Sequence, residues 1–197
     1  MAKRIFDFMC AVCGLLLLAP LFALISLCIK LDSKGPIFFR QLRIGRFQKP
    51  FYIYKFRTMI QEAEKKGMKL TIGRDRRITK CGMILRKYKI DELPQLINVL
   101  KGEMSLVGPR PEVPEYVKYY PEHIKEIVFS VRPGITDYAS LKFRNENILL
   151  ASATDPEKIY VEKILPEKLQ LYVHYVRHRS LIGDILIILK TLIRLGS

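Results

Sequence analysis

Hydrophobic and polar positions divide the chain into an apolar N-terminal segment and a longer region of mixed pattern. From Phe8 to Ile29 no residue carries a charge, and roughly 22 apolar and small residues are enough for a helix that crosses a bilayer. No comparable run occurs later in the sequence. We therefore expect a membrane segment over residues 1–31 and a single domain outside the bilayer over residues 32–197.

Three arrangements of the membrane segment compete. A cleaved signal peptide normally has a shorter apolar region of about 7–15 residues, so it is disfavoured. Pro20 lies near the middle of the run, where its missing N–H would kink a helix, and cationic residues flank both ends. The positive-inside rule would keep both flanks cytoplasmic. These features favour a re-entrant helix over a straight span. The margin is small, because proline also occurs in ordinary spanning helices.

The rest of the pattern predicts a mainly helical α+β domain with a small β-hairpin. Aromatic and β-branched residues on both sides of a turn at 45–50 predict the hairpin over residues 36–59. The other expected elements are a polar helix (61–70), a cation-rich loop (71–80), short helices (82–89 and 91–102), a proline-rich loop (105–114), a turn (132–136) and a helical stretch (156–179).

The C-terminal residues 181–195 alternate apolar stripes with Lys190 and Arg194. This pattern is typical of an amphipathic helix that lies in the membrane interface. An ordinary core helix would show almost the same pattern. We expect the interfacial helix and keep the core helix as the alternative.

Charge and composition narrow the class of partner. Lys and Arg number 34 against 19 Asp and Glu, which gives a net charge of +15 on a chain that is 49% hydrophobic. The aromatic and aliphatic content excludes a disordered tail, and the charge indicates an anionic partner, which is nucleic acid, a phosphorylated small molecule or a membrane face. Cations and aromatic residues interleave over 36–59, as in single-stranded nucleic-acid binding. A simple ribbon with its aromatic side chains packed inward is the favoured alternative.

Two adjacent acids, Asp91 and Glu92, lie among cations at the expected start of a helix. Capping of the helix N-terminus explains most such residues. The dipole and the nearby Arg86, Lys87 and Lys89 would also hold Asp91 ionised, as a nucleophile or a Mg²⁺ ligand must be. Side chains of adjacent helical residues point about 100° apart, so the two acids need different tasks.

Basic side chains recur in contexts that restrict their backbone, and phosphates are what such side chains hold well. The candidates for phosphate binding are Lys55, Arg57, Arg86, Arg110, Arg132 and Arg144. Any one of them alone is more often a solvated surface residue. Together with a carboxylate nucleophile they predict a phosphoryl-transfer site. The sequence has no glycine-rich phosphate loop, so side chains and a metal would hold the phosphates.

Three blocks carry a specific resemblance. The sequences KFRTM (55–59), DELPQLINVLKGEMSLVGPRPE (91–112) and RPGIT (132–136) are similar to those of the bacterial sugar transferases known as monotopic polyprenyl-phosphate phosphoglycosyl transferases. The resemblance extends from the hydrophobic segment to at least Arg144. The short chain with one hydrophobic segment resembles the minimal members of that family.

The resemblance implies a reaction and a location. A UDP-sugar would give its sugar-1-phosphate to undecaprenyl phosphate and release UMP, with Mg²⁺ as cofactor, in the first membrane step of a bacterial glycoconjugate pathway. Asp91 would be nucleophile and metal ligand, and Glu92 a catalytic partner of unsettled proton role. The domain over 32–197 would be catalytic, at the cytoplasmic face of the plasma membrane, with both termini cytoplasmic and a membrane helix broken at Pro20. No nucleic-acid partner is expected.

The chain departs from its relatives after RPGIT. Many of them continue with Gly-Trp-Ala-Gln, whereas this chain has Asp137-Tyr138-Ala139-Ser140, so no sugar can be assigned by resemblance. The competing hypothesis is a non-catalytic, membrane-anchored basic domain that binds RNA or anionic lipid through the aromatic hairpin. It explains the charge and leaves the DELPQL block with no task beyond capping.

Overall fold

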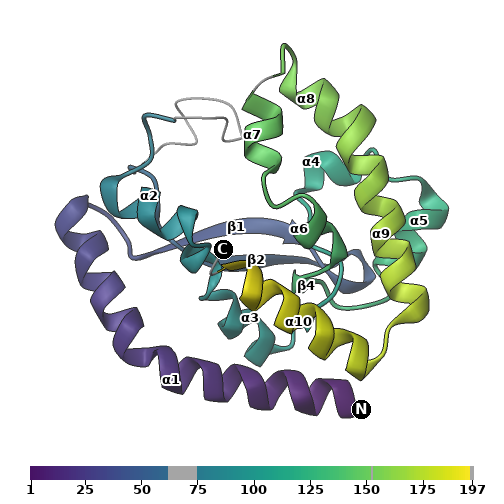
Figure 1. Cartoon of the computed structure of the whole chain (residues 1–197), viewed down its shortest axis with the longest axis horizontal. Helices are drawn as coiled ribbons and strands as arrows, with labels where there is room; N and C mark the ends of the chain where they lie inside the picture. Colours follow the sequence, from purple (N-terminus) through teal and green to yellow (C-terminus); the bar gives the residue numbers. More distant parts are fainter. Residues whose placement is uncertain (62–74, 152, 196–197) are drawn as a thin grey trace.

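The computed structural model describes residues 1–61, 75–151 and 153–195 and confirms a mainly helical chain with small sheets (Figure 1). The polar helix expected over 61–70 falls almost wholly outside the described residues. The α-helices are α1 (Ala2–Asp32), α2 (Lys80–Lys87), α3 (Gln95–Lys101), α4 (Pro114–Val117), α5 (Glu122–Val128), α6 (Tyr138–Lys142), α7 (Glu146–Ala151), α8 (Pro156–Ile159), α9 (Leu165–His178) and α10 (Leu181–Leu195).

The strands form two separate sheets of two strands each within the described residues. The strands and other short helices are β1 (Phe38–Ile44), β2 (Pro50–Phe56), β3 (Ser105–Val107), β4 (Gly134–Thr136), the 3₁₀ turns η1 (Arg46–Gln48) and η3 (Ile90–Glu92), and the π-helical segment η4 (Tyr160–Ile164).

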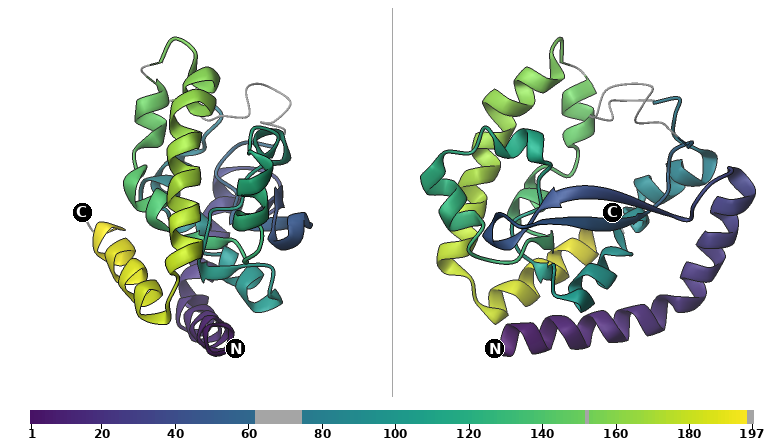
Figure 2. Two further views of the ribbon diagram at one scale, coloured as in Figure 1. Left: turned by 90° about the vertical axis from the view of Figure 1, so that its right-hand side faces the viewer. Right: turned by 180° about the vertical axis from the view of Figure 1, so that it is seen from behind.

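The N-terminal segment is a single helix of 31 residues that is long and apolar enough to cross a membrane. The break expected at Pro20 is not confirmed, because α1 continues through this proline. The helix is nonetheless strongly bent along its length (Figure 1 and Figure 2), and a proline inside a helix is an ordinary cause of such a bend. Its first half packs through Ala11 against Leu96 of α3, and its second half packs through Ile29 against Leu85 of α2.

Both ends of α1 are hydrogen-bonded to the rest of the chain. Near the first turn, Arg4 donates to the carbonyl oxygens of Val99, at 2.6 Å, and Leu100, at 3.0 Å. Just beyond the last turn, Arg57 donates to the carbonyl oxygen of Ser33 at 2.6 Å. The helix is therefore held to one domain at both of its ends.

A buried polar cluster strengthens the N-terminal attachment. Asp7, only 2% exposed, accepts a hydrogen bond from the Ser105 hydroxyl at 2.8 Å. Lys3 donates to the buried carboxylate of Asp184 at 2.5 Å, and the Tyr175 hydroxyl donates to the same carboxylate at 2.9 Å. These contacts tie α1 to β3, α9 and α10. No expectation from the sequence included them.

The expected β-hairpin is confirmed. β1 and β2 pair antiparallel, with Phe38 opposite Phe56 and Ile44 opposite Pro50. Phe51 and Phe56 are buried in the core. The aromatic side chains at these two positions therefore pack inward, as in the simple ribbon, and are not open for stacking on nucleic-acid bases.

The second sheet corrects two expectations. Residues 105–114 and 132–136 were expected to be a loop and a turn, and each instead contributes a short strand, β3 and β4, which pair in parallel. A Cβ on Gly134 would lie 2.1 Å from the backbone nitrogen of Gly108, so only glycine allows this approach. Because the strands have three residues each, their pattern is too short to distinguish from a loop.

The helical stretch expected over 156–179 is confirmed as the continuous run of α8, η4 and α9. The short helix expected over 82–89 is α2, two residues earlier. The C-terminal helix α10 has apolar residues on both sides: Ile187 is buried, whereas Ile182 and Ile193 are 74% and 73% exposed. Its apolar outer face agrees with an interfacial helix, which remains a prediction.

Candidate functional site

A cavity of about 1570 Å³ lies between the β-hairpin, the segment from α2 to α3 and the helices of the C-terminal half. The predicted site residues that line it are Lys55, Arg57, Arg86, Asp91, Glu92, Arg110 and Arg144. Arg132 is not among the described lining residues. Its guanidinium instead donates to the carbonyl oxygen of Gly102 at 2.7 Å, at the end of α3.

The two adjacent acids lie in the 3₁₀ turn η3, just before α3. Neither η3 nor α3 has a side-chain hydrogen bond at its cap, so the capping interpretation of Asp91 is wrong. Asp91 is 8% exposed, and its Oδ1 atom is buried with no hydrogen-bond partner among the described residues. A buried carboxylate oxygen with no partner is costly in a folded protein and needs an explanation.

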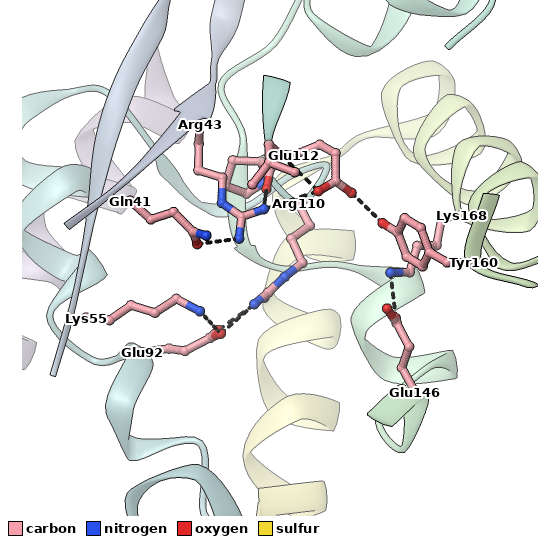
Figure 3. A network of polar contacts seen from close by, with 11 residues as sticks. Gln41, Arg43, Lys55, Glu92, Arg110, Glu112, Glu146, Tyr160 and Lys168 are labelled. Carbon is pink, nitrogen blue, oxygen red and sulfur yellow. Dashed lines mark hydrogen bonds and ion pairs between the residues drawn. The ribbon is translucent and has the colours of Figure 1, made fainter. Parts of the chain in front are cut away.

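Glu92 is held by two cations from different elements (Figure 3). Lys55 of β2 donates to Glu92 Oε1 at 2.7 Å, and Arg110 donates through Nη1 to Oε2 at 3.1 Å and through Nη2 to Oε1. This two-point contact fixes the plane of the guanidinium. The two adjacent acids therefore have different surroundings. This agrees with the expectation that they have different tasks.

The two acids also differ in their electrostatics. Burial raises the pKa of Asp91, and the charges of Lys55 and Arg86 only oppose that change. The nearby cations therefore favour the ionised form of Asp91, as expected from the sequence, but burial has the larger effect on its pKa. Burial acts on Glu92 too, but the charges and hydrogen bonds of Arg110 and Lys55 outweigh it and hold the pKa of Glu92 well below its usual range.

Two of the other predicted cations make structural contacts at the cavity wall. Arg86 donates from Nε to the Thr58 hydroxyl at 2.8 Å. A Cβ on Gly82 would lie 2.1 Å from the Thr58 carbonyl oxygen, so this glycine lets α2 approach the end of β2. Arg57 is 5% exposed and holds the end of α1, and its Nε and Nη1 atoms are buried without a partner among the residues that the structure describes.

Arg110 is positioned by a residue that the sequence analysis did not place in the site. The backbone nitrogen of Arg110 donates to the Asp137 Oδ2 atom at 2.9 Å, and Asp137 also caps α6 through the backbone nitrogen of Ser140. Asp137 is 1% exposed. The sequence does contain one signal for this residue: the departure from the relatives after RPGIT begins at Asp137.

A second polar network lines the same cavity beyond Arg110 (Figure 3). Glu112 accepts hydrogen bonds from Arg43 at 3.2 Å and from the Tyr160 hydroxyl at 2.5 Å. Lys168 pairs with Glu146 at 2.5 Å. No sequence pattern indicated this network, because its members come from β1, the loop after β3, α7, η4 and α9 and share no local motif.

The donor set is compatible with a magnesium ion bound partly by substrate. The described residues contain no group of three or more His, Cys, Asp or Glu that could hold a metal. Mg²⁺ commonly uses one or two carboxylates and completes its shell with water and substrate phosphates. Asp91 Oδ1 fits that role because it is buried and has no hydrogen-bond partner in the described part of the chain, whereas both oxygens of Glu92 are engaged by cations.

Comparisons with known proteins agree with the three sequence blocks. Residues 1–196 match the family described as "Bacterial sugar transferase". The chain is 38% identical over 192 residues to the UDP-N-acetylgalactosamine-undecaprenyl-phosphate N-acetylgalactosaminephosphotransferase of Aeromonas hydrophila, covering 96% of this chain and 42% of that protein.

The names of two further relatives contain glucose instead of N-acetylgalactosamine. The UDP-glucose:undecaprenyl-phosphate glucose-1-phosphate transferase of Caulobacter vibrioides is 38% identical over 191 residues, covering 96% of this chain and 67% of that protein. The protein of the same name from Escherichia coli is 36% identical over 195 residues, covering 98% and 39%. The chain therefore spans less than half of two of these relatives. Their names share undecaprenyl phosphate as acceptor and differ in the sugar.

Proposed function

The chain belongs to the bacterial sugar transferase family, and from this premise we propose that it transfers sugar-1-phosphate from a UDP-sugar to undecaprenyl phosphate. The observation that carries the proposal is the buried Asp91 carboxylate, whose Oδ1 atom has no partner among the described residues, in a cavity lined by cations. A carboxylate nucleophile needs such an open position, and phosphates need the cations.

The reaction would proceed in two displacements at one phosphorus atom. An oxygen of Asp91 attacks the sugar-side phosphorus of the donor, the bond from that phosphorus to the bridging oxygen breaks, and UMP leaves. The enzyme then carries the sugar phosphate on Asp91. In the second step a phosphate oxygen of undecaprenyl phosphate attacks the same phosphorus, and the bond to Asp91 breaks, which regenerates the free carboxylate.

Glu92 would act by fixing cations and not by giving up a proton in the free protein. Its low pKa keeps it charged, and its hydrogen bonds orient Lys55 and Arg110. Pre-positioned cations stabilise the charge that spreads over the phosphoryl oxygens in the transition state. Arg86, Arg144 and Arg57 line the same cavity and are proposed to contact the phosphates of the two substrates.

A Mg²⁺ ion bound by Asp91 and the donor diphosphate would neutralise part of the phosphate charge and polarise the bond that breaks. The protein's share of this site is the Asp91 carboxylate. Removal of the metal by a chelator is expected to abolish UMP release, and added Mg²⁺ is expected to restore it. Full activity with a chelator present would contradict the role of the metal.

The proposed location is the cytoplasmic face of the bacterial plasma membrane, with α1 re-entrant. Arg4 holds the start of α1, and Arg57 holds its end, to the same domain. A straight spanning helix would place these ends on opposite sides of the bilayer, where one domain cannot reach both. The exposed leucines of α1, such as Leu17 and Leu31, would then face lipid.

The nucleophile is tested by Asp91→Asn, with Asp155→Asn as matched control. Asp155 is an exposed residue that caps α8 and is not among the described residues that line the cavity. The Asp91 variant should lose turnover and should form no phosphosugar adduct detectable by mass spectrometry after incubation with UDP-sugars and Mg²⁺. The control should keep both. Normal turnover in the Asp91 variant would remove Asp91 from the mechanism.

The non-catalytic alternative predicts a different result. Salt-dependent RNA binding that survives in the Asp91 variant, without UMP release from any UDP-sugar by the unmodified protein, would support it. The family match and the inward packing of Phe51 and Phe56 favour the enzyme.

A further inference from the structure

The network beyond Arg110 has charges that cancel within it. We call it the distal network and define it as Arg43, Glu112, Glu146, Tyr160 and Lys168. Arg43 pairs with Glu112, and Lys168 pairs with Glu146. All five residues line the cavity that also contains Asp91. In Figure 3 the Arg110 side chain lies between this network and the Glu92 carboxylate.

The two ends of the cavity therefore suit ligands of different charge. Around Glu92, Lys55 and Arg110 share one carboxylate, which leaves positive charge for phosphates. In the distal network each cation has its own carboxylate, so there is no surplus charge to attract an anion. A neutral ligand group with hydrogen-bonding atoms suits these paired side chains.

Two buried polar groups of the cavity lining have hydrogen-bonding capacity left over. Arg43 Nε is buried without a partner among the described residues. The Ser140 Oγ atom is also buried with no hydrogen bond of proper geometry, although it lies near the Asp137 carboxylate and lowers its pKa. Both residues line the cavity. Free donors beside carboxylate acceptors are suited to hydroxyl groups, which donate and accept.

The rings of Tyr160 and Phe143, which line the cavity, already have close neighbours. The Lys168 Nζ atom lies 4.8 Å from the centre of the Tyr160 ring, and the Tyr116 ring lies 4.8 Å from it, centre to centre. The Phe143 ring has Lys142 and Lys168 at 5.5 Å and 6.0 Å. A pyrimidine base is commonly held by stacking on an open aromatic face. These neighbours leave less room for a base to stack on the two rings, which favours a saturated, hydroxyl-bearing ring.

We propose that the distal network binds the sugar of the donor and determines which sugar is transferred. The inference rests on the proposed function. The sugar is bonded directly to the phosphate that Asp91 attacks, and Glu112 follows Arg110 by two residues in the same loop. The Tyr160 hydroxyl, the carboxylates of Glu112 and Glu146, and Ser140 would distinguish the configuration of sugar hydroxyls, because a buried polar group left unpaired by the wrong sugar costs binding free energy.

The test compares donors in two small substitutions, Tyr160→Phe and Ser140→Ala, with Tyr119→Phe as control. Tyr119 is 54% exposed and is not among the described lining residues. UMP release is measured with UDP-glucose, UDP-galactose, UDP-N-acetylglucosamine and UDP-N-acetylgalactosamine, and UDP is used as a competitive inhibitor. For the best donor, kcat/KM should fall roughly tenfold or more, as expected for loss of one hydrogen bond. The ratio between donors should change, and the inhibition constant of UDP should not.

Two results would overturn the inference. If kcat/KM fell by the same factor for every donor, so that the ratio between donors stayed unchanged, the network would only support the fold. A rise in the inhibition constant of UDP in parallel with KM would assign this end of the cavity to the nucleoside. Thermal unfolding in detergent identifies a variant that has lost its fold. Absence of UMP release from all donors in the unmodified protein would instead contradict the proposed function itself.

Discussion

Glu92 pairs with two cations in the cavity, and its replacement tests what those contacts do. Glu92→Gln keeps the size and one acceptor oxygen but removes the charge that pairs with Lys55 and Arg110. We expect kcat/KM for UMP release to fall about 100-fold or more, as when a pre-positioned transition-state contact is lost, with the fold intact by circular dichroism. Full activity would reduce Glu92 to a structural acid.

Asp137 is the second residue whose role can be isolated. Its carboxylate accepts hydrogen bonds from the backbone nitrogens of Arg110 and Ser140. Asp137→Ala should lower the free energy of unfolding by roughly 1–3 kcal/mol, because two partly buried backbone donors lose their partner. Denaturant titration in detergent measures this change. An unchanged midpoint would show that the loop carrying Arg110 is held by other contacts.

At the scale of single residues, the sequence indicated which side chains line the cavity better than it indicated their contacts. Asp91, Glu92, Lys55 and Arg110 do meet in one cavity. Arg132 instead bonds to a backbone carbonyl, because the parallel pairing of β3 and β4 fixes where its segment lies. No local pattern encodes that pairing, so the position of this arginine could not be read from the sequence.

Among the elements, the close approach of β3 and β4 is the one most sensitive to change. In Gly134→Ala the added Cβ would lie 2.1 Å from the Gly108 nitrogen, so the backbone that leads to Arg110 must move. We expect a loss of stability of about 1–3 kcal/mol, as for overpacking, and a drop in turnover. Gly14→Ala is the control, because its Cβ would meet only the flexible end of Leu96, at 3.2 Å.

The length of each helix or strand determined whether it could be predicted from the sequence. The hairpin of β1 and β2, the α2 helix and the run from α8 to α9 have enough residues to show a period, and they are confirmed. The helices α4, α6 and α7 have 4, 5 and 6 residues and were not predicted. Helices this short depend on tertiary packing more than on local propensity.

For the whole molecule, the attachment of both ends of α1 predicts sidedness. With the native cysteines replaced by serine, Ala2→Cys and Lys49→Cys should react with a membrane-impermeant thiol reagent in inverted vesicles and not in intact cells. Lys49 lies in the turn of the β-hairpin, so it reports the side of the domain. Labelling of residue 2 from outside the cell, with residue 49 labelled from inside, would contradict the re-entrant helix.

The bend of α1 has a consequence for the lipid itself. A spanning helix must match the hydrocarbon thickness, and each ångström of mismatch costs a fraction of a kcal/mol. A helix whose two ends return to the same domain reaches into one leaflet, so bilayer thickness does not enter its insertion energy. Turnover in nanodiscs should therefore change little between lipids with short and long acyl chains, whereas loosening the packing of the near leaflet should affect it.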